Sequence, residues 1–318
     1  MAKKRYEIKY YSSIKEEDIQ WLWYPYIPLG KITLFQGDPG DGKSMFLMHL
    51  ISCFTTGKQL PDGTTPKERI TVLYQCNEDG NADPIKPRLL SFGADCEKVA
   101  FIPEEETPLN IEDIRIEEAI KDTGTKLIVF DPIQAYLPED CDMLNAVKMR
   151  SVLKRLSHLA EHYKCAIVLV SHMTKSGKKK NLYRSLGSID IAASARSMLM
   201  IQRDSDNPEL RYIFPVKSNL AAEGNAVRFI LNKDIGFHIL GTCEWPKKED
   251  SQKEISCKKT DKAEKLIRIF LSDNMMPSKV VLDQLKKAGI SERTARGVTK
   301  NIGVKAIRKG NAWYWSLS

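Results

Sequence analysis

The sequence lacks the features that mark several specialised classes of protein. No apolar run approaches the roughly 20 residues that a membrane-spanning helix needs. Basic residues near the start are not followed by an apolar stretch, so we expect no signal peptide. The seven cysteines include no CxxC pair, and this pattern fits reduced thiols better than a zinc site or a disulfide framework. The sequence therefore predicts a soluble, globular protein of the cytoplasm that has no membrane partner.

Excess positive charge is lacking in most of the chain and is concentrated at its C-terminal end. Residues 247–318 contain 17 Lys and Arg against 8 Asp and Glu. Subtracting these from the totals of 49 and 41 leaves 32 against 33 for residues 1–246. Such asymmetry favours a nucleic-acid partner for the C-terminal end, and a solvated lysine-rich tail is the alternative.

Residues 1–246 alternate between strand-like and helix-like patterns. The apolar runs of strand length are KITLFQG, ITVLYQC, KVAFIP, KLIVFDP and CAIVLVSH. Helical spacing occupies longer stretches between several of them, including Ser44–Phe54 and Leu144–Tyr163. Strands that are apolar on both faces and separated by helices predict an α/β fold with a mostly parallel sheet. From about Ser197, strand-like runs follow one another with short breaks, which predicts an antiparallel extension of the sheet.

A second, smaller domain is expected after a polar linker. Residues 247–262 are charged and without periodicity, which indicates a linker between domains at 1–246 and 263–318. Helical patterns cover Ala263–Leu271, Lys279–Ala288 and Glu292–Asn301, and two strand-like segments follow. Three helices and a hairpin in this order predict a small winged helix-turn-helix domain.

A phosphate-binding loop occupies residues 37–44. It matches G-x-x-x-x-G-K-[ST] with the residues Gly37, Asp38, Pro39, Gly40, Asp41, Gly42, Lys43 and Ser44. The motif follows a predicted strand and opens a predicted helix, which is the context that phosphate binding requires. We expect Lys43 to reach the β- and γ-phosphates of ATP and Ser44 to ligate Mg²⁺. A glycine-rich turn with an exposed lysine is the alternative.

Three further side chains stand where apolar strands end, and the strands that end near Glu78 and in Asp131 are expected beside the strand that leads into the phosphate-binding loop. Asp131 ends one strand and is expected to hold Mg²⁺ through water. Because Pro132 and not a glutamate follows it, the best candidate for the base that orients the attacking water is Glu78. His172 ends a third strand and is expected to sense the γ-phosphate. The alternatives are a surface turn capped by Glu78 and a structural histidine.

Together these motifs carry a resemblance to a known family. GDPGDGKS, Glu78-Asp79, LIVFDP and LVSHMTKSG resemble the RecA-type ATPases of the RepA-like hexameric replicative helicases, especially those of phages and mobile elements. The resemblance extends over nearly the whole chain, including YRSLGSIDIAASARSMLMIQRD and FPVKSNLAAEG. It implies a RecA-like core that hydrolyses ATP between the subunits of a hexameric ring. It also implies that Glu78 is the catalytic base and His172 the sensor.

In that family a neighbouring subunit supplies an arginine to the nucleotide. Arg196 best matches this arginine finger, and Arg184 competes with it. Lys217 is expected to reach the same phosphates from the neighbour. A cation supplied in this way neutralises charge that builds up in the transition state. Ordinary ion pairing is the alternative for all three residues.

DNA contacts are expected in two places. In the related helicases a loop after the histidine strand lines a central pore for single-stranded DNA, and its counterparts here are Lys175, Lys178, Lys179, Lys180 and Arg184. A solvated surface loop is the alternative. In the third C-terminal helix, Arg293, Arg296 and Lys300 share one face and are expected to bind duplex DNA, although such a domain can instead bind a replication protein. Trp313 and Trp315 are expected in the core of this domain.

The leading hypothesis is an ATP-dependent DNA helicase or translocase acting in replication. An ATP-switched DNA-binding regulator and a recombinase-like filament without unwinding activity are the alternatives. A base at Glu78 together with an arginine finger favours repeated turnover over a slow switch.

Overall fold

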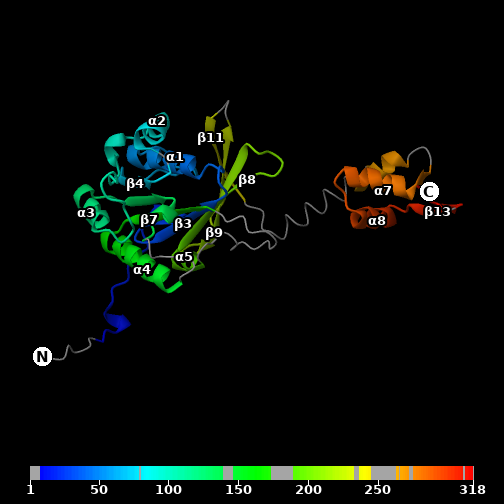
Figure 1. Cartoon of the computed structure of the whole chain (residues 1–318). Coiled ribbons are helices and arrows are strands. Elements are labelled where there is room, and N and C mark those ends of the chain that lie inside the picture. The colour runs from blue at the N-terminus through cyan, green and yellow to red at the C-terminus, as the bar shows by residue number, and fades with distance from the viewer. Residues whose placement is uncertain are drawn as a thin grey trace. The chain divides into compact units, whose positions relative to one another are not determined.

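The computed structural model describes residues 8–78, 80–138, 146–172, 189–232, 236–244, 263–264, 266–271, 275–310 and 312–317. The chain divides into two compact units, Met1–Glu244 and Trp245–Ser318 (Figure 1). The expected linker at residues 247–262 lies outside the described ranges. In the described part of the chain, every helix is too short or too polar to cross a membrane.

The first unit contains a nine-stranded sheet in the order β11-β10-β9-β8-β3-β7-β6-β4-β5. Its strands are β3 Ile32–Gly37, β4 Val72–Cys76, β5 Val99–Ala100, β6 Leu127–Asp131, β7 Ala166–His172, β8 Ser197–Arg203, β9 Leu210–Ser218, β10 Ala226–Asn232 and β11 Gly236–Cys243. The helices are α1 Lys43–Thr56, α2 Lys86–Ser91, α3 Ile114–Thr123, α4 Ala146–Tyr163 and α5 Ile189–Ser194. Strands β1 Trp21–Trp23 and β2 Ile27–Pro28 form a separate antiparallel pair. The predicted α/β class, with parallel strands and an antiparallel extension, is confirmed.

Two details of the sheet differ from the sequence expectation. Strand β8, which the sequence grouped with the antiparallel strands, pairs parallel with β3, so the antiparallel run begins at β9. Strand β7 lies between β3 and β6, and neither β4 nor β6 is the neighbour of the P-loop strand. Strand order depends on where each crossover helix returns the chain, and local patterns do not encode it.

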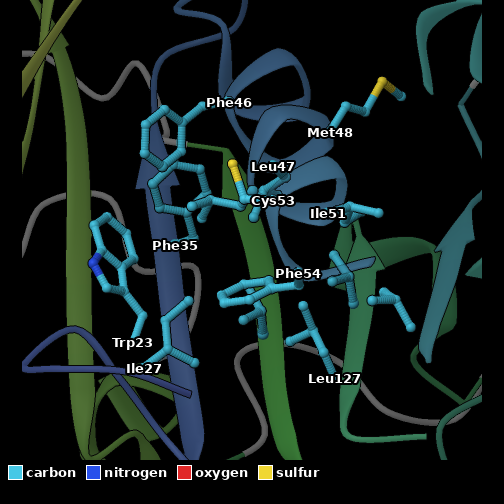
Figure 2. Close-up of a cluster of buried hydrophobic side chains, with 14 of the residues drawn as sticks. Trp23, Ile27, Phe35, Phe46, Leu47, Met48, Ile51, Cys53, Phe54 and Leu127 are labelled. Carbon is cyan, nitrogen blue, oxygen red and sulfur yellow. The ribbon is translucent and has the colours of Figure 1, made fainter. Parts of the chain in front are cut away.

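Hydrophobic cores cover both faces of the sheet because successive side chains of a strand point to opposite sides. Phe35 of β3 packs with α1 on one face, whereas Leu34 belongs to the cluster formed with α3, α4 and α5 on the other. Figure 2 shows Phe46 and Phe54 of α1 in the first cluster beside Phe35. The rings of Phe35 and Phe46 have centroids 6.1 Å apart. Helix α1 is therefore fixed against the strand that leads into it.

The second unit has its own core. Residues 263–264 and 266–270 are helical, and α7 Ser278–Lys287 and α8 Glu292–Asn301 follow. Strands β12 Met276–Pro277, β14 Ala312–Ser316 and β13 Lys305–Lys309 form a three-stranded sheet in that order. Ser291 caps α8 by accepting a hydrogen bond from the N–H of Thr294 at 3.2 Å.

The two tryptophans of β14 have different environments. Trp315 is 6% exposed and belongs to the core cluster of this unit, as expected. Trp313 is 54% exposed, so the expectation that it lies in the core is wrong. Trp313 pairs with Arg308 close to the turn at Gly310, whereas Trp315 pairs with Ala306 farther from it. Near the turn the hairpin extends past the residues that form the core.

Candidate functional site

The phosphate-binding loop connects the end of β3 to the start of α1. Gly40 has φ 78° and Gly42 has φ 95°, which are values that favour glycine because a Cβ is disfavoured there. Gly42 is the N-cap of α1, a helix of 14 residues. The first N–H groups of such a helix have no intrahelical acceptors, and the helix dipole adds positive potential at this end. The loop and the helix therefore form a site for an anion.

Lys43 lies inside this loop. Its side chain is buried, and Nζ donates to the carbonyl oxygens of Gly37 and Asp38 at 2.9 Å each. Burial lowers the pKa of the Lys43 ammonium, and the negative charge of Asp131 acts in the opposite direction. The loop thus holds the cation at the place where the phosphates of a nucleotide would arrive.

Asp131 meets the loop directly. Its Oδ2 accepts hydrogen bonds from Ser44 Oγ at 2.7 Å and from the Tyr74 hydroxyl at 3.1 Å. Burial raises the pKa of this carboxyl group, while the hydrogen bonds from Ser44 and Tyr74 act to lower it. A hydroxyl and a carboxylate oxygen side by side fit the oxygen ligands that Mg²⁺ prefers. Among the described residues there is no group of three His, Cys, Asp or Glu that could hold a metal ion.

Glu78 and His172 also come together at this edge of the sheet. Although β7 and β6 separate β3 from β4, the side chain of Glu78 reaches back to His172 on β7. Glu78 Oε1 and His172 Nε2 lie 3.2 Å apart. His172 Nδ1 is buried and has no hydrogen-bond partner among the described residues. The structure therefore pairs the two side chains that the sequence assigned to the base and the sensor.

Arg196 and Lys217 lie near the start of β3, at the opposite end of this strand from the phosphate-binding loop. The N–H of Arg196 donates to Ile32 at the start of β3, whereas the phosphate-binding loop follows the end of β3 about 17 Å away at 3.3 Å per residue. Lys217 pairs with Met198 at this same end, and its Nζ donates to the carbonyls of Ala192 and Ala195 at 2.9 and 2.8 Å. The Arg196 side chain is exposed. Neither residue is close to the phosphate-binding loop of its own chain.

The loop expected to line a pore lies outside the described residues. This applies to Lys175, Lys178, Lys179, Lys180 and Arg184, and also to Asp79. On α8, Arg293, Arg296 and Lys300 are all exposed, and Arg296 pairs with Glu292 at 2.8 Å.

Sequence reasoning missed two arginines that contact the phosphate-binding loop. Arg203 Nε donates to Asp41 Oδ1 at 2.8 Å, and its Nη2 donates to the carbonyl of Gly40. Arg211 is buried, and its Nε donates to the carbonyl of Asp41 at 2.9 Å. Both stand at strand ends beside apolar runs, but only the pairing of β8 with β3 brings them to the loop.

The chain is similar to several known proteins. Residues 11–178, more than half of the chain, match a family described as an AAA domain. The DNA repair protein RadA of Chlamydia muridarum is 25% identical over 152 residues, which is 47% of this chain and 29% of RadA. RadA of Chlamydia trachomatis is 24% identical over the same length. The chain thus spans less than a third of the length of these relatives.

Two solved structures each match about two thirds of this chain. The ATPase domain of G40P has a TM-score of 0.50 and 11% identity, with 67% of this chain and 85% of that domain covered. A KaiC-like protein of Pyrococcus horikoshii has a TM-score of 0.48 and 18% identity, with 71% and 99% covered. From the family match, the sheet and the phosphate-binding loop, the chain belongs to the AAA domain family and contains a RecA-like P-loop ATPase core.

Proposed function

We propose that this chain is an ATP-dependent DNA helicase or translocase that acts as a hexameric ring in the replication of a phage or mobile element in the cytoplasm. The observation that carries the proposal is the convergence of Lys43, Ser44, Asp131, Glu78 and His172 from four strand ends at one edge of the sheet. A phosphate cradle alone would bind a nucleotide. An acid and a histidine beside the cradle add the groups that hydrolysis requires.

Each residue has a defined part in this proposal. The N–H groups of residues 37–44 bind the phosphates, and Lys43 contacts the β- and γ-phosphates. Ser44 and Asp131 hold Mg²⁺, which neutralises phosphate charge when it is bound. Glu78 orients the attacking water, and His172 senses the γ-phosphate. His172 Nε2 and Glu78 Oε1 are 3.2 Å apart, so a movement of the His172 ring would also change the position of the Glu78 carboxylate.

Ring assembly is supported by the placement of Arg196 and Lys217. Both residues lie at the opposite end of the strands from the phosphate-binding loop. The only nucleotide that they could contact is therefore one that is bound to another subunit. A guanidinium or ammonium supplied in this way neutralises transition-state charge. Lys217 would have to exchange the carbonyls of Ala192 and Ala195 for phosphate oxygens. Arg184 remains the competing finger.

DNA is the proposed partner of both units. The lysine-rich loop at residues 175–184 would contact single-stranded DNA in a central pore. We take the C-terminal unit to be a winged helix, whose exposed Arg293, Arg296 and Lys300 would meet duplex DNA or a replication protein. The chlamydial relatives are named as DNA repair proteins, which supports a DNA substrate.

One experiment tests the proposal as a whole. ATPase rates are measured with and without single-stranded DNA for the wild type and for Lys43→Ala, Glu78→Gln and Arg196→Ala. We expect DNA to stimulate the wild type and each variant to lose most of its activity. Mixing Lys43→Ala with Arg196→Ala chains should restore part of it, because a mixed interface joins an intact loop to an intact finger. Absence of any ATP turnover by the wild type would refute the proposal.

A second assay separates the alternative functions. Strand displacement on a forked duplex is expected of a helicase and not of a nucleotide-switched regulator or a recombinase-like filament. Electron microscopy with ATP and DNA then distinguishes closed rings from filaments. A protein that hydrolyses ATP, binds DNA and displaces no strand would favour the alternatives.

A further inference from the structure

Two arginines from neighbouring strands donate hydrogen bonds to the phosphate-binding loop. Arg203 and Arg211 face each other across the β8–β9 ladder. Arg203 Nη2 donates to the carbonyl of Gly40, and Arg211 Nε donates at 2.9 Å to the carbonyl of Asp41, the next residue. Two consecutive peptide groups of the loop are therefore bound from the same pair of strands.

Binding a carbonyl from behind also fixes the N–H group of the same peptide. A trans peptide is planar, and its C=O and N–H point in opposite directions. Arg211 on the Asp41 carbonyl therefore directs the N–H of Gly42 away from the strands, on the side where phosphate binds. Arg203 on the Gly40 carbonyl likewise orients the N–H of Asp41, which closes the turn by donating to Asp38 at 3.2 Å.

The Asp41 side chain gives Arg203 a second role. Its carboxylate is buried within the loop, where Oδ2 accepts the N–H of Asp38 at 3.0 Å and Oδ1 accepts Arg203 Nε at 2.8 Å. An uncompensated carboxylate beside a triphosphate would repel it, and the repulsion is strong where water is excluded. The guanidinium of Arg203 neutralises this charge.

Arg211 is itself held in place by nearby backbone carbonyls. Its Nη1 donates to the carbonyls of Pro208, Glu209 and Leu231 at 3.1, 2.6 and 3.0 Å. Four carbonyl contacts leave the buried guanidinium in one orientation. The antiparallel strands thereby act as a rigid support behind the loop.

We infer that Arg203 and Arg211 are positioning residues of the nucleotide site: they orient two consecutive peptides of the phosphate-binding loop, and Arg203 neutralises Asp41 so that the loop accepts a triphosphate. This inference rests on the nucleotide site of the proposed function and is independent of DNA binding. It assigns the antiparallel strands β8 and β9 a part in ATP affinity.

The test compares Arg203→Gln, Asp41→Asn and the double variant in the full chain. The Arg203 side chain is 43% exposed, so its replacement should leave the fold intact, as a thermal melt would verify. We expect Arg203→Gln to raise the Kd for ATP about tenfold by titration calorimetry, with kcat at saturating ATP within about twofold. In the double variant the Kd should return to within about threefold of the wild type, because the unpaired carboxylate is gone.

Arg69→Gln is the matched control. Arg69 is exposed and precedes the start of β4, at the ends of the parallel strands away from the loop. Its Kd should equal that of the wild type. An unchanged Kd for Arg203→Gln, or a double variant that binds no better than Arg203→Gln, would overturn the inference while leaving ATP binding intact. A wild type that binds no ATP would instead refute the proposed function. Should Arg203→Gln unfold, Arg203→Lys, which keeps the charge but has no planar guanidinium to bind Asp41 and Gly40 from two nitrogens, gives the same test with an expected rise of about threefold.

Discussion

Gly297 offers a sharp test of the C-terminal unit because stability and binding should respond to it in opposite directions. It lies inside α8 on the exposed side that also carries Arg293, Arg296 and Lys300. A Cβ built at this position meets no atom within 4 Å. Nothing in the described part of the chain therefore requires glycine there, although glycine costs a helix interior about 1 kcal/mol relative to alanine.

Gly297→Ala should accordingly raise the stability of the C-terminal unit by about 1 kcal/mol, or roughly 4–8 °C in Tm for a unit of this size. If the exposed face of α8 lies against duplex DNA, the added methyl group stands where the DNA approaches the helix most closely. Affinity should then fall about threefold for Gly297→Ala and tenfold or more for Gly297→Gln. Thermal melts and fluorescence anisotropy with a labelled duplex measure the two effects on the same samples.

The salt dependence provides the control. Neither glycine variant changes charge, so the slope of log Kd against log salt should stay as in the wild type, whereas Lys300→Ala should reduce it by about one. Lys154→Ala, an exposed lysine on α4 in the other unit, is the matched charge control. A Gly297→Ala protein that is more stable and binds duplex DNA with unchanged affinity would refute the assignment of this face to DNA. In that case we would assign the exposed face of α8 to a protein partner, whose binding the same variants should weaken.

Four further outcomes follow from the nucleotide site and its surroundings. Lys43→Ala should weaken ATP binding by about a hundredfold in calorimetry, because the change removes a buried ammonium held inside the phosphate-binding loop. Asp131→Asn should raise the Mg²⁺ concentration for half-maximal ATPase activity about tenfold, because Asp131 lies against Ser44 where Mg²⁺ would bind, and an unchanged requirement would contradict this assignment. Glu78→Gln should lower kcat by about 10²–10⁴-fold, with ATP affinity by calorimetry nearly unchanged. Burial lowers the pKa of His49 from 6.5 to about 4, so the unfolded chain binds its proton at a higher pH. Stability should therefore fall by about 2–3 kcal/mol from pH 6.5 towards pH 4 in urea titrations, and His49→Gln should flatten this profile.

Sequence reasoning placed residues correctly where their position follows from a single strand or helix. Asp131 and His172 could be placed at one edge because the ends of buried parallel strands meet there. The loop at residues 37–44 was identified in the same way, from a strand, a glycine pattern and a helix.

What the sequence could not show depends on pairing across the sheet. The contact between Glu78 and His172 arises because β7 lies between β3 and β6, an order set by the crossover connections. Arg203 and Arg211 reach the loop only because β8 joins β3 in parallel and β9 returns beside it. Trp313 and Trp315 have the same local pattern, and only the length of the hairpin relative to the core exposes one of them. These features depend on contacts between residues that are far apart in the sequence, and the local hydrophobic pattern does not encode them.

The separation of Arg196 from the phosphate-binding loop also has a consequence for dilution. If Arg196 is the finger, every nucleotide site is completed by a second chain, either through a head-to-tail contact in a ring or through a reciprocal contact in a twofold dimer. Turnover per chain should then rise with protein concentration, because dilution separates each finger from the loop that it serves.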